Sequence, residues 1–367
     1  MQKKLIIFIP SIESGGVEKN LFIIANYLSK KIPDMSILTS NNCYDQKFNK
    51  TIKIIYPKKK TFQSSNRFIK ILICCFLLIL EILKNKKIAV LSFQANIYAT
   101  IICKIFGIKI IVRSNSAAYF YGSNFFKDYI FKKILKKSDK VIVNSLELKK
   151  KLLKKYNISS TCIYNPLDIK KIKRLSIKKI RKNFFKEKNF VKIINVGRLT
   201  DQKDQITILK AIKEIKDKIN IKLLIMGQGK NKKQLEDYIK NNNLKNIVKI
   251  KKFTNNPYNF IKSADIFILS SLYEGLPNVL LEAITLNKFI ISTDCPTGPK
   301  EILYNGKGGL LFNAGNYIEL SKKILFFYYN YNLCLKKIAI AKSGLKRFEY
   351  KINLDKYLKL VKTALTI

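Results

Sequence analysis

The chain alternates short, continuously apolar runs with longer segments in which apolar and polar residues are mixed. Runs of four to six apolar residues bounded by polar ones are typical of strands buried in a parallel sheet, and the longer segments predict connecting helices. The alternation predicts an α/β fold. The predicted strands are Leu5–Ile9, Met35–Thr39, Ile52–Tyr56, Ile88–Phe93, Ile108–Val112, Lys140–Asn144, Val191–Val196, Ile221–Met226, Ile247–Lys251, Ile266–Leu269, Phe289–Thr293 and Gly308–Phe312.

One predicted helix, Arg67–Leu83, contains ten continuous apolar residues, Ile71 to Leu80. A helix that spans a bilayer needs about 20 such residues, so this segment is too short to cross one. Two interpretations remain open. The helix is buried on a face of the sheet, or it lies partly in a membrane interface between the basic residues that flank it.

Composition excludes several classes of enzyme and narrows the compartment. The 367 residues include no histidine, which excludes a Ser-His-Asp triad and His-ligated metal sites. The seven cysteines have no metal-ligand spacing, and their odd number argues against a disulfide framework. The basic start before Leu5 is followed by too short an apolar run for a signal peptide. We therefore expect a reduced, cytoplasmic compartment.

The net charge of +47 is the extreme feature of the composition. Part of it is the lysine excess that an AT-rich genome produces together with abundant Ile and Asn. Residues 1–189 carry a net charge of +30 and residues 190–367 one of +17. Because no aromatic-rich RNA motif accompanies the charge, an anionic membrane surface is the expected partner and nucleic acid is not.

The candidate chemistry centres on the segment that follows the strand Ile266–Leu269. Gly275 and Pro277 interrupt the chain before a helix that begins near Asn278. The free backbone N–H groups at a helix start form a ready anion site, and Glu274 and Glu282 bracket it. This arrangement suits a sugar nucleotide, whose hydroxyls the carboxylates bind. The donor-binding segment is Gly275, Leu276, Pro277, Asn278, Val279 and Leu280.

The string from Glu274 to Glu282, with Glu-Gly-Leu-Pro at its start, resembles the signature of family 4 retaining glycosyltransferases. That resemblance covers nearly the whole chain and implies the GT-B fold, with two Rossmann-like domains facing a central cleft. It implies an acceptor-side domain at 1–170, a nucleotide-sugar-binding domain at 171–345, and a helix at 346–367 that crosses back to the first domain.

Further segments match the same family. Gly197 and Arg198, followed by Lys203, resemble its phosphate-binding motif, in which the two cations neutralise the leaving diphosphate. Gly227 follows the next strand and is expected to line the nucleotide pocket. The Gly15-Gly16 pair resembles the loop that faces the donor phosphates and the acceptor.

Two more residues are predicted at the end of the strand Ile108–Val112. Many family members have a histidine hereabouts that touches the donor sugar, and in this chain that contact is either absent or made by Asn115 or Arg113. A later turn, Pro296-Thr297-Gly298-Pro299, resembles members that transfer hexosamine-type sugars in surface glycan assembly.

The resemblance implies transfer of a hexose or N-acetylhexosamine from a UDP-sugar, with retention and without a metal or other cofactor. Glu274, Arg198 and Lys203 are the predicted catalytic residues, and Glu282 is expected to bind the ribose. The expected acceptor is a polyprenyl-linked or other membrane glycan of surface polysaccharide or glycoprotein glycan assembly, at the inner face of the membrane. A polyanion-binding protein on the same scaffold and a transferase with a soluble acceptor stay open.

Overall fold

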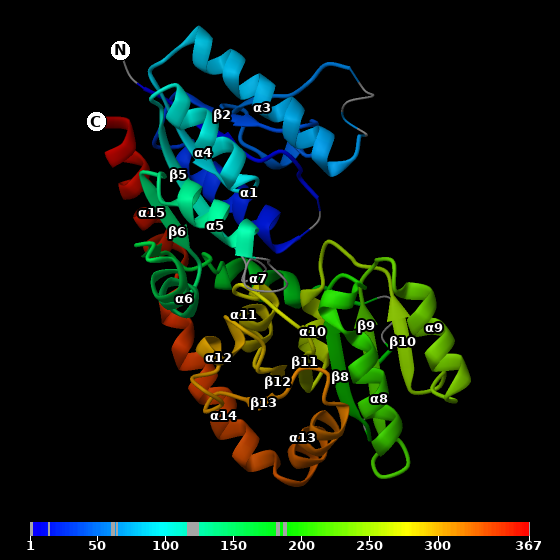
Figure 1. Cartoon of the computed structure of the whole chain (residues 1–367). Helices are drawn as coiled ribbons and strands as arrows, with labels where there is room; N and C mark the ends of the chain where they lie inside the picture. The colour runs from blue at the N-terminus through cyan, green and yellow to red at the C-terminus, as the bar shows by residue number, and fades with distance from the viewer. Residues whose placement is uncertain are drawn as a thin grey trace. The chain divides into compact units, whose positions relative to one another are not determined.

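The computed structural model describes residues 3–13, 15–59, 63, 65–115, 125–180, 184–185 and 189–366, with the side chains of 125–127 excepted. The chain divides into two compact units, the first formed by residues 1–166 and 350–367 and the second by residues 167–349. The division falls after Pro166, close to the predicted boundary at residue 170. Each unit is an α/β domain around one parallel sheet (Figure 1).

The first unit contains a seven-stranded sheet in the order β3-β2-β1-β4-β5-β6-β7, and all its pairings are parallel. The central strands are almost completely buried, as their continuous apolar runs require. The strands are β1 (Lys4–Phe8), β2 (Met35–Leu38), β3 (Lys53–Ile55), β4 (Ile88–Ser92), β5 (Lys109–Ser114), β6 (Lys140–Val143) and β7 (Thr161–Cys162).

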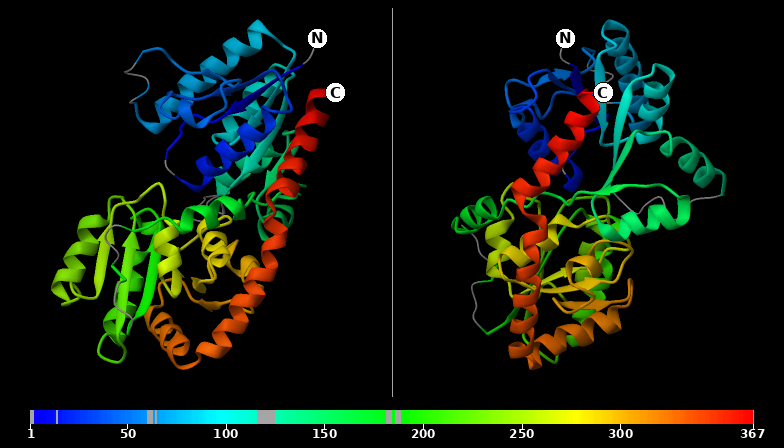
Figure 2. Two further views of the ribbon diagram at one scale, coloured as in Figure 1. Left: turned by 180° about the vertical axis from the view of Figure 1, so that it is seen from behind. Right: turned by 90° about the vertical axis from the view of Figure 1, so that its left-hand side faces the viewer.

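Helices cover both faces of this sheet. On one face, α1 (Gly16–Leu28) and α15 (Tyr350–Thr366) pack with the strands into one apolar core. The last helix of the chain therefore belongs to the first unit, beside strands more than two hundred residues earlier in the sequence (Figure 2). The other face carries α3 (Arg67–Lys84), α4 (Asn96–Ile105), α5 (Phe125–Leu135) and α6 (Leu146–Tyr156).

The second unit contains a six-stranded parallel sheet in the order β10-β9-β8-β11-β12-β13. Its strands are β8 (Val191–Val196), β9 (Ile221–Met226), β10 (Val248–Lys251), β11 (Ile266–Leu269), β12 (Phe289–Thr293) and β13 (Leu310–Phe312). Its helices are α7 (Ile169–Ser176), α8 (Gln205–Ile215), α9 (Lys232–Asn241), α10 (Tyr258–Ser263), α11 (Asn278–Thr285), α12 (Pro299–Ile302), α13 (Tyr317–Tyr329) and α14 (Tyr331–Ser343).

The long apolar helix α3 combines features of both interpretations of its sequence. Cys74, Leu78 and Ile82 are fully buried against the sheet, whereas other apolar side chains of the helix remain exposed. Among the described residues, the structure contains no helix long and apolar enough to cross a bilayer.

The Lys-rich stretch that follows Pro166 contains α7, which Asp168 caps by accepting a hydrogen bond from the backbone N–H of Lys171. The bounds of α5, α7, α8, α10 and α12 were not predicted from the sequence.

Candidate functional site

The functional residues predicted in the second unit gather at one edge of its sheet. β9, β8, β11 and β12 are adjacent parallel strands, so their carboxyl ends lie together. Gly197 follows β8, Gly227 follows β9, and Ser270 follows β11. Ligands of open α/β sheets bind at this edge, outside the carboxyl ends of the strands.

Glycine at position 227 permits a close contact between two of these turns. A Cβ atom at Gly227 would lie 1.9 Å from the carbonyl oxygen of Gly197, so no larger residue fits without movement of the backbone. The backbone N–H of Gly197 donates to the carbonyl of Met226 at 3.0 Å. The two predicted glycines therefore hold the ends of β8 and β9 together.

Glu274 and Lys203, both predicted as catalytic, form an ion pair. The carboxylate also accepts a hydrogen bond from the hydroxyl of Ser271 at 2.7 Å. Both side chains are mostly buried, with 17% of Lys203 and 10% of Glu274 exposed. A fixed cation and a fixed anion thus stand next to each other at the carboxyl edge of the sheet.

Hydrogen bonds join the loop after β8 to the loop after β11. The hydroxyl of Ser270 donates to the carbonyl of Lys203 at 2.7 Å, and the backbone N–H of Leu272 donates to the carbonyl of Gln202 at 2.8 Å. The side-chain amide of Gln202 donates in turn to the carbonyl of Tyr273 at 2.9 Å. The Lys203–Glu274 pair therefore rests on a braced backbone, as a preorganised site requires.

Arg198 differs from Lys203 in having an exposed side chain. Its backbone carbonyl accepts a hydrogen bond from the side chain of Gln205 at 2.9 Å, which fixes the turn that bears it. Within the described part of the chain, its guanidinium makes no ion pair. The exposed guanidinium of Arg198, beside the turns after β8 and β9, is therefore available to an anionic ligand.

The helix α11 begins at the same edge, directly after the Glu274–Pro277 loop. Pro277 is its N-cap residue and makes no side-chain cap hydrogen bond, and the backbone N–H of Leu280 donates to the carbonyl of Pro277 at 3.1 Å. The helix dipole favours an anion at this end, and the predicted contacts of Asn278, Val279 and Leu280 with the donor stay a prediction. Glu282 lies within the helix and is 6% exposed. Its predicted contact with a ribose stays a prediction.

The Pro296–Pro299 turn supports the Glu274–Pro277 loop, a role that the sequence did not indicate. The hydroxyl of Thr297 donates to the carbonyl of Glu274 at 2.6 Å. A Cβ atom at Gly298, whose φ is +89°, would lie 2.3 Å from the carbonyl oxygen of Gly275. Thr297 also has a positive φ, 69°, which is unusual for a β-branched residue. The turn is therefore held in a costly conformation directly against the loop.

Cys295 stands just before this turn and is buried near Glu274 and Lys203. Burial raises the pKa of its thiol to about 12. Because the thiolate is the reactive form, this thiol is chemically inert at neutral pH.

In the first unit, Gly15 is the N-cap residue of α1 and Gly16 is its first residue, as predicted for a helix that opens at this pair. A Cβ atom at Gly15 would come 2.6 Å from a carboxylate oxygen of Glu18, so that carboxylate folds back over the start of the helix. The side chain of Gln94 donates to the other oxygen of Glu18 at 3.3 Å. A phosphate at this helix start would have to displace the carboxylate, and the predicted ligand contact of both glycines stays untested.

The structure corrects the prediction for Arg113. Its side chain is 1% exposed, and it donates to the hydroxyl of Tyr357 and to the side-chain carbonyl of Asn165, both at 2.7 Å. Arg113 therefore joins β5 to α15 inside the first unit instead of facing a ligand. Asn115 donates to the carbonyl of Phe93 at 3.0 Å, while its buried Oδ1 atom accepts no hydrogen bond from the residues that the structure describes.

The described residues contain no group of three or more Cys, Asp or Glu side chains that could hold a metal ion. The side chains of Arg198 and Lys203 place two cations at the carboxyl edge of the second sheet. The arrangement places cations next to the carboxylate of Glu274. The cations can bind the phosphates of a nucleotide sugar, and the carboxylate can bind the hydroxyls of its sugar.

Comparison with known families matches both units. The model described as Glycosyltransferase Family 4 matches residues 14–171, and the model described as Glycosyl transferases group 1 matches residues 176–343. Together the two matches cover most of the chain.

Individual relatives agree with these matches. The chain is 28% identical over 333 residues to the N-acetylgalactosamine-N,N'-diacetylbacillosaminyl-diphospho-undecaprenol 4-alpha-N-acetylgalactosaminyltransferase of Campylobacter jejuni, and the alignment covers 86% of this chain and 87% of that protein. It is 38% identical over 201 residues to an uncharacterized glycosyltransferase of Methanocaldococcus jannaschii, and this alignment covers 49% of this chain and 49% of that protein.

Solved structures share the fold. A glycosyltransferase from Rickettsia africae superposes with a TM-score of 0.80 at 20% identity, over 99% of both chains. The Anabaena protein HepE in complex with UDP and glucose also superposes with a TM-score of 0.80, at 15% identity, over 98% of this chain and 100% of that one. At these identities the likeness shows the fold alone.

Proposed function

The chain belongs to the family 4 (group 1) glycosyltransferases with the GT-B fold, and from this membership we propose that it transfers a hexosyl or N-acetylhexosaminyl group from a UDP-sugar. We further propose that the transfer retains the anomeric configuration and needs no metal. The acceptor in this proposal is a lipid-linked glycan of surface polysaccharide or glycoprotein glycan assembly.

The observation that carries the proposal is the arrangement at the carboxyl edge of the second sheet. An exposed Arg198, the Lys203–Glu274 pair and the start of α11 adjoin turns that converge there. A nucleoside diphosphate needs cations and backbone N–H groups at its phosphates, and its sugar needs a hydrogen-bond acceptor. Arg198 and the start of α11 supply the cation and the N–H groups for the phosphates, and Glu274 supplies the acceptor for the sugar.

In the proposed reaction, a hydroxyl of the acceptor forms a bond to the anomeric carbon while the bond from that carbon to the β-phosphate oxygen breaks. The proton of the hydroxyl passes to the leaving phosphate oxygen, so no side chain acts as a nucleophile. Negative charge builds up on that phosphate oxygen as its bond to the sugar breaks and before the proton arrives, and Arg198, Lys203 and the helix start stabilise this charge. Glu274 orients the donor sugar.

The Lys203–Glu274 pair suits this reaction because each partner holds the other in place. Lys203 can lie at the departing phosphate while Glu274 binds the sugar on the other side of the breaking bond. Since cations of the protein neutralise the phosphates, we propose that a divalent metal is not required. The pair is preformed before any ligand binds, so reorganisation at the moment of reaction is small.

The lipid-linked acceptor is proposed on two grounds. The name of the Campylobacter jejuni relative states transfer to a diphospho-undecaprenol-linked sugar, and that relative aligns over most of both chains. The more basic N-terminal half of this chain, with its net charge of +30, suits an acceptor held at an anionic membrane surface. We accordingly place the protein at the inner face of the membrane.

The test measures UDP release from a panel of UDP-sugars, with membrane extract as acceptor and EDTA present. Wild type is compared with Glu274→Gln, and Glu236→Gln on the exposed surface of α9 is the matched control. The proposal predicts release with one donor sugar, its loss in Glu274→Gln, and wild-type release in Glu236→Gln. NMR of the product then gives the anomeric configuration.

Two outcomes would overturn parts of the proposal. Release that requires Mg²⁺ or Mn²⁺ contradicts metal independence, and release with a soluble acceptor in place of the extract contradicts the lipid-linked one. The charge of +47 also suits a polyanion. Steeply salt-dependent RNA binding that Glu274→Gln leaves unchanged, without UDP release, would favour that function instead.

A further inference from the structure

The outward face of α3 is apolar along its whole length. Phe68, Leu72, Phe76 and Leu83 are exposed, with 61% of Phe76 accessible to solvent. These residues lie opposite the side of the helix that packs on the sheet. The helix is therefore apolar on two faces, and only one of them is covered by the protein.

The apolar surface continues onto α4. α3 and α4 pack against each other, α4 packs against α5, and all three lie on the same face of the sheet (Figure 1). Tyr98, Ile101 and Ile105 form an exposed stripe along α4, with 72% of Ile105 accessible. We call these seven side chains the α3–α4 surface. A contiguous exposed apolar surface on a water-soluble domain marks an interaction site.

Exposed basic residues lie on the helices that carry this surface and on the segments next to them. Between Arg67 and Lys140 the chain contains 14 Lys or Arg residues, of which Arg113 is buried, and only three acidic ones. An apolar centre with a cationic border is the composition of surfaces that bind acidic bilayers. The exposed basic residues of the border are Arg67, Lys84, Lys86, Lys87, Lys133, Lys136 and Lys137.

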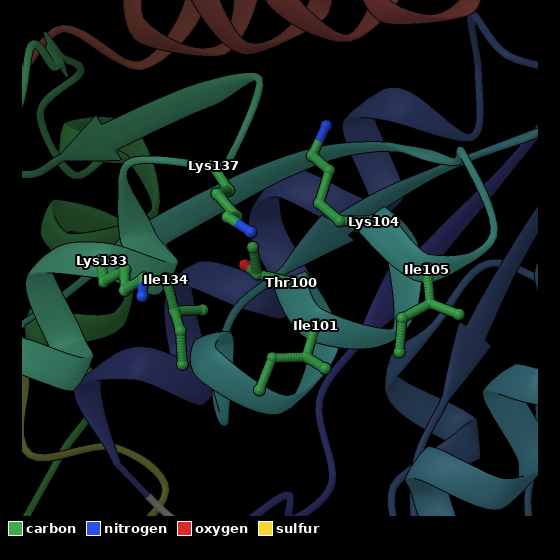
Figure 3. A pocket seen from close by; sticks show the side chains of 7 residues that line it. All are labelled: Thr100, Ile101, Lys104, Ile105, Lys133, Ile134 and Lys137. Atoms are coloured by element: carbon green, nitrogen blue, oxygen red, sulfur yellow. The ribbon is translucent and has the colours of Figure 1, made fainter.

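A shallow depression of about 310 Å³ lies between α4 and α5, next to the α3–α4 surface (Figure 3). It is lined by Thr100, Ile101, Lys104 and Ile105 from α4, by Lys133 and Ile134 from α5, and by Lys137 just after α5. In the part of the chain that the structure describes, Lys133 and Lys137 make no ion pair. The ammonium of Lys133 lies over the ring of Tyr129, 5.9 Å from its centroid. Two ammonium groups without an acidic partner beside isoleucines suit a lipid phosphate and the start of its acyl chains.

We propose that the α3–α4 surface, with this depression, is the docking face for a bilayer that contains acidic phospholipids. The apolar side chains enter the headgroup region, and the border lysines bind lipid phosphates. A second copy of the chain fits less well, because a symmetric contact through this face would bring the two basic borders together.

The α3–α4 surface runs along the length of both helices. Each helix here runs back from the carboxyl end of one strand to the amino end of the next, so Phe68 and Tyr98 lie toward the carboxyl edge of the sheet, and Leu83 and Ile105 toward its amino edge. The depression lies at the last turns of α4 and α5, at the amino edge. Gly15 and Asn115 lie at the opposite, carboxyl edge, so a lipid phosphate in the depression would leave that edge uncovered.

The inference rests on the proposed function for its purpose, since docking would bring the enzyme to a lipid-linked acceptor, but its test needs no transfer. The full chain is sedimented with vesicles of phosphatidylcholine alone or mixed with phosphatidylglycerol. We expect wild type to bind only the mixed vesicles. Leu72→Ser/Phe76→Ser should weaken this binding roughly tenfold or more, and Lys133→Gln/Lys137→Gln should weaken it about tenfold in low salt.

Matched controls come from the second unit. Tyr329→Ser/Leu333→Ser removes two exposed apolar side chains, and Lys233→Gln/Lys240→Gln removes two exposed charges. The inference is overturned if these controls lose vesicle binding as much as the α3 and α5 variants do, or if the Leu72→Ser/Phe76→Ser variant binds like wild type. A wild-type dimer in solution that this variant converts to a monomer would assign the surface to self-association.

Binding of UDP separates this test from that of the proposed function. If the docking variants bind UDP like wild type, they are folded and the vesicle result concerns docking alone. If wild type binds acidic vesicles but no variant of the second unit affects UDP binding, the docking inference stands and the proposed donor site fails.

Discussion

Replacement of Gly298 by alanine tests whether the Pro296–Pro299 turn positions the donor loop. The added Cβ would lie 2.3 Å from the carbonyl oxygen of Gly275 and 2.7 Å from Cδ of Pro277. Ordinary van der Waals contact begins at about 3.4 Å, so the Gly275–Pro277 segment must move by about 1 Å. That segment connects Glu274 to the start of α11 and therefore carries both donor contacts with it.

A displacement of about 1 Å at a reacting group can lower a rate as much as a hundredfold. Alanine also carries a backbone penalty of roughly 1–2 kcal/mol where φ is positive. Gly306→Ala separates the two effects, because Gly306 has a φ of +88°, almost the same as that of Gly298, and a Cβ there would meet only a methyl group of Leu311 at 3.9 Å.

The assay pairs urea unfolding with UDP-sugar turnover for both variants. We expect both to lose about 1–2 kcal/mol of unfolding free energy, while only Gly298→Ala loses turnover, by roughly tenfold to a hundredfold. Equal loss of turnover in the two variants would refute the positioning role, since the backbone penalty would then explain the result. Full turnover in Gly298→Ala would refute it as well.

Three further substitutions test other contacts. Tyr357→Phe removes an acceptor from the buried Arg113 guanidinium and should lower the unfolding free energy by about 1–3 kcal/mol in urea. Lys203→Met should destabilise the protein more than Lys203→Met/Glu274→Gln in thermal melts, because the single change leaves a mostly buried carboxylate without its cation. Burial raises the pKa of Asp204, so the folded state disfavours its ionised form; Asp204→Asn should raise the melting temperature at pH 7, and the gain should vanish as the pH falls to about 4.

Each of these has an outcome that contradicts it. Tyr27→Phe removes a partly exposed hydrogen bond from Tyr27 to Asp355, which lies on α15 as Tyr357 does. An equal loss of unfolding free energy in that variant would show that burial does not make the contact of Tyr357 more important. A double variant less stable than Lys203→Met would show that the carboxylate is well solvated. A gain for Asp204→Asn that stays constant with pH would come from the backbone, whose φ of 46° suits asparagine, and not from ionisation.

The sequence predicted the strands because each is a continuous apolar run between polar residues, a pattern that a buried parallel strand needs. It also predicted the turns at Gly197, Gly227 and Gly275, since glycine and proline mark strand ends without tertiary information. α5 escaped prediction because its lysines lie on a helix with weak periodicity.

The contacts of the site could not be predicted, because they join residues distant in the chain. Lys203 and Glu274 are 71 positions apart, and a motif that names both does not show that they pair. Arg113 looked like a ligand contact because it is polar at a strand end. Its partner Tyr357 is 244 positions away, and only the fold of α15 onto the first unit shows that the guanidinium is buried.

The most direct test of the central claim is calorimetric titration of UDP, in EDTA, into wild type, Arg198→Ala and Lys230→Ala. Lys230 forms an exposed ion pair with Asp201 near the same loop and serves as the charge-matched control. The account predicts that wild type binds UDP, that Arg198→Ala binds roughly tenfold to a hundredfold more weakly because a charged phosphate contact is lost, and that Lys230→Ala is unchanged. Equal affinity in wild type and Arg198→Ala, or no binding by wild type, would contradict a nucleotide-sugar site at the carboxyl edge of the second sheet.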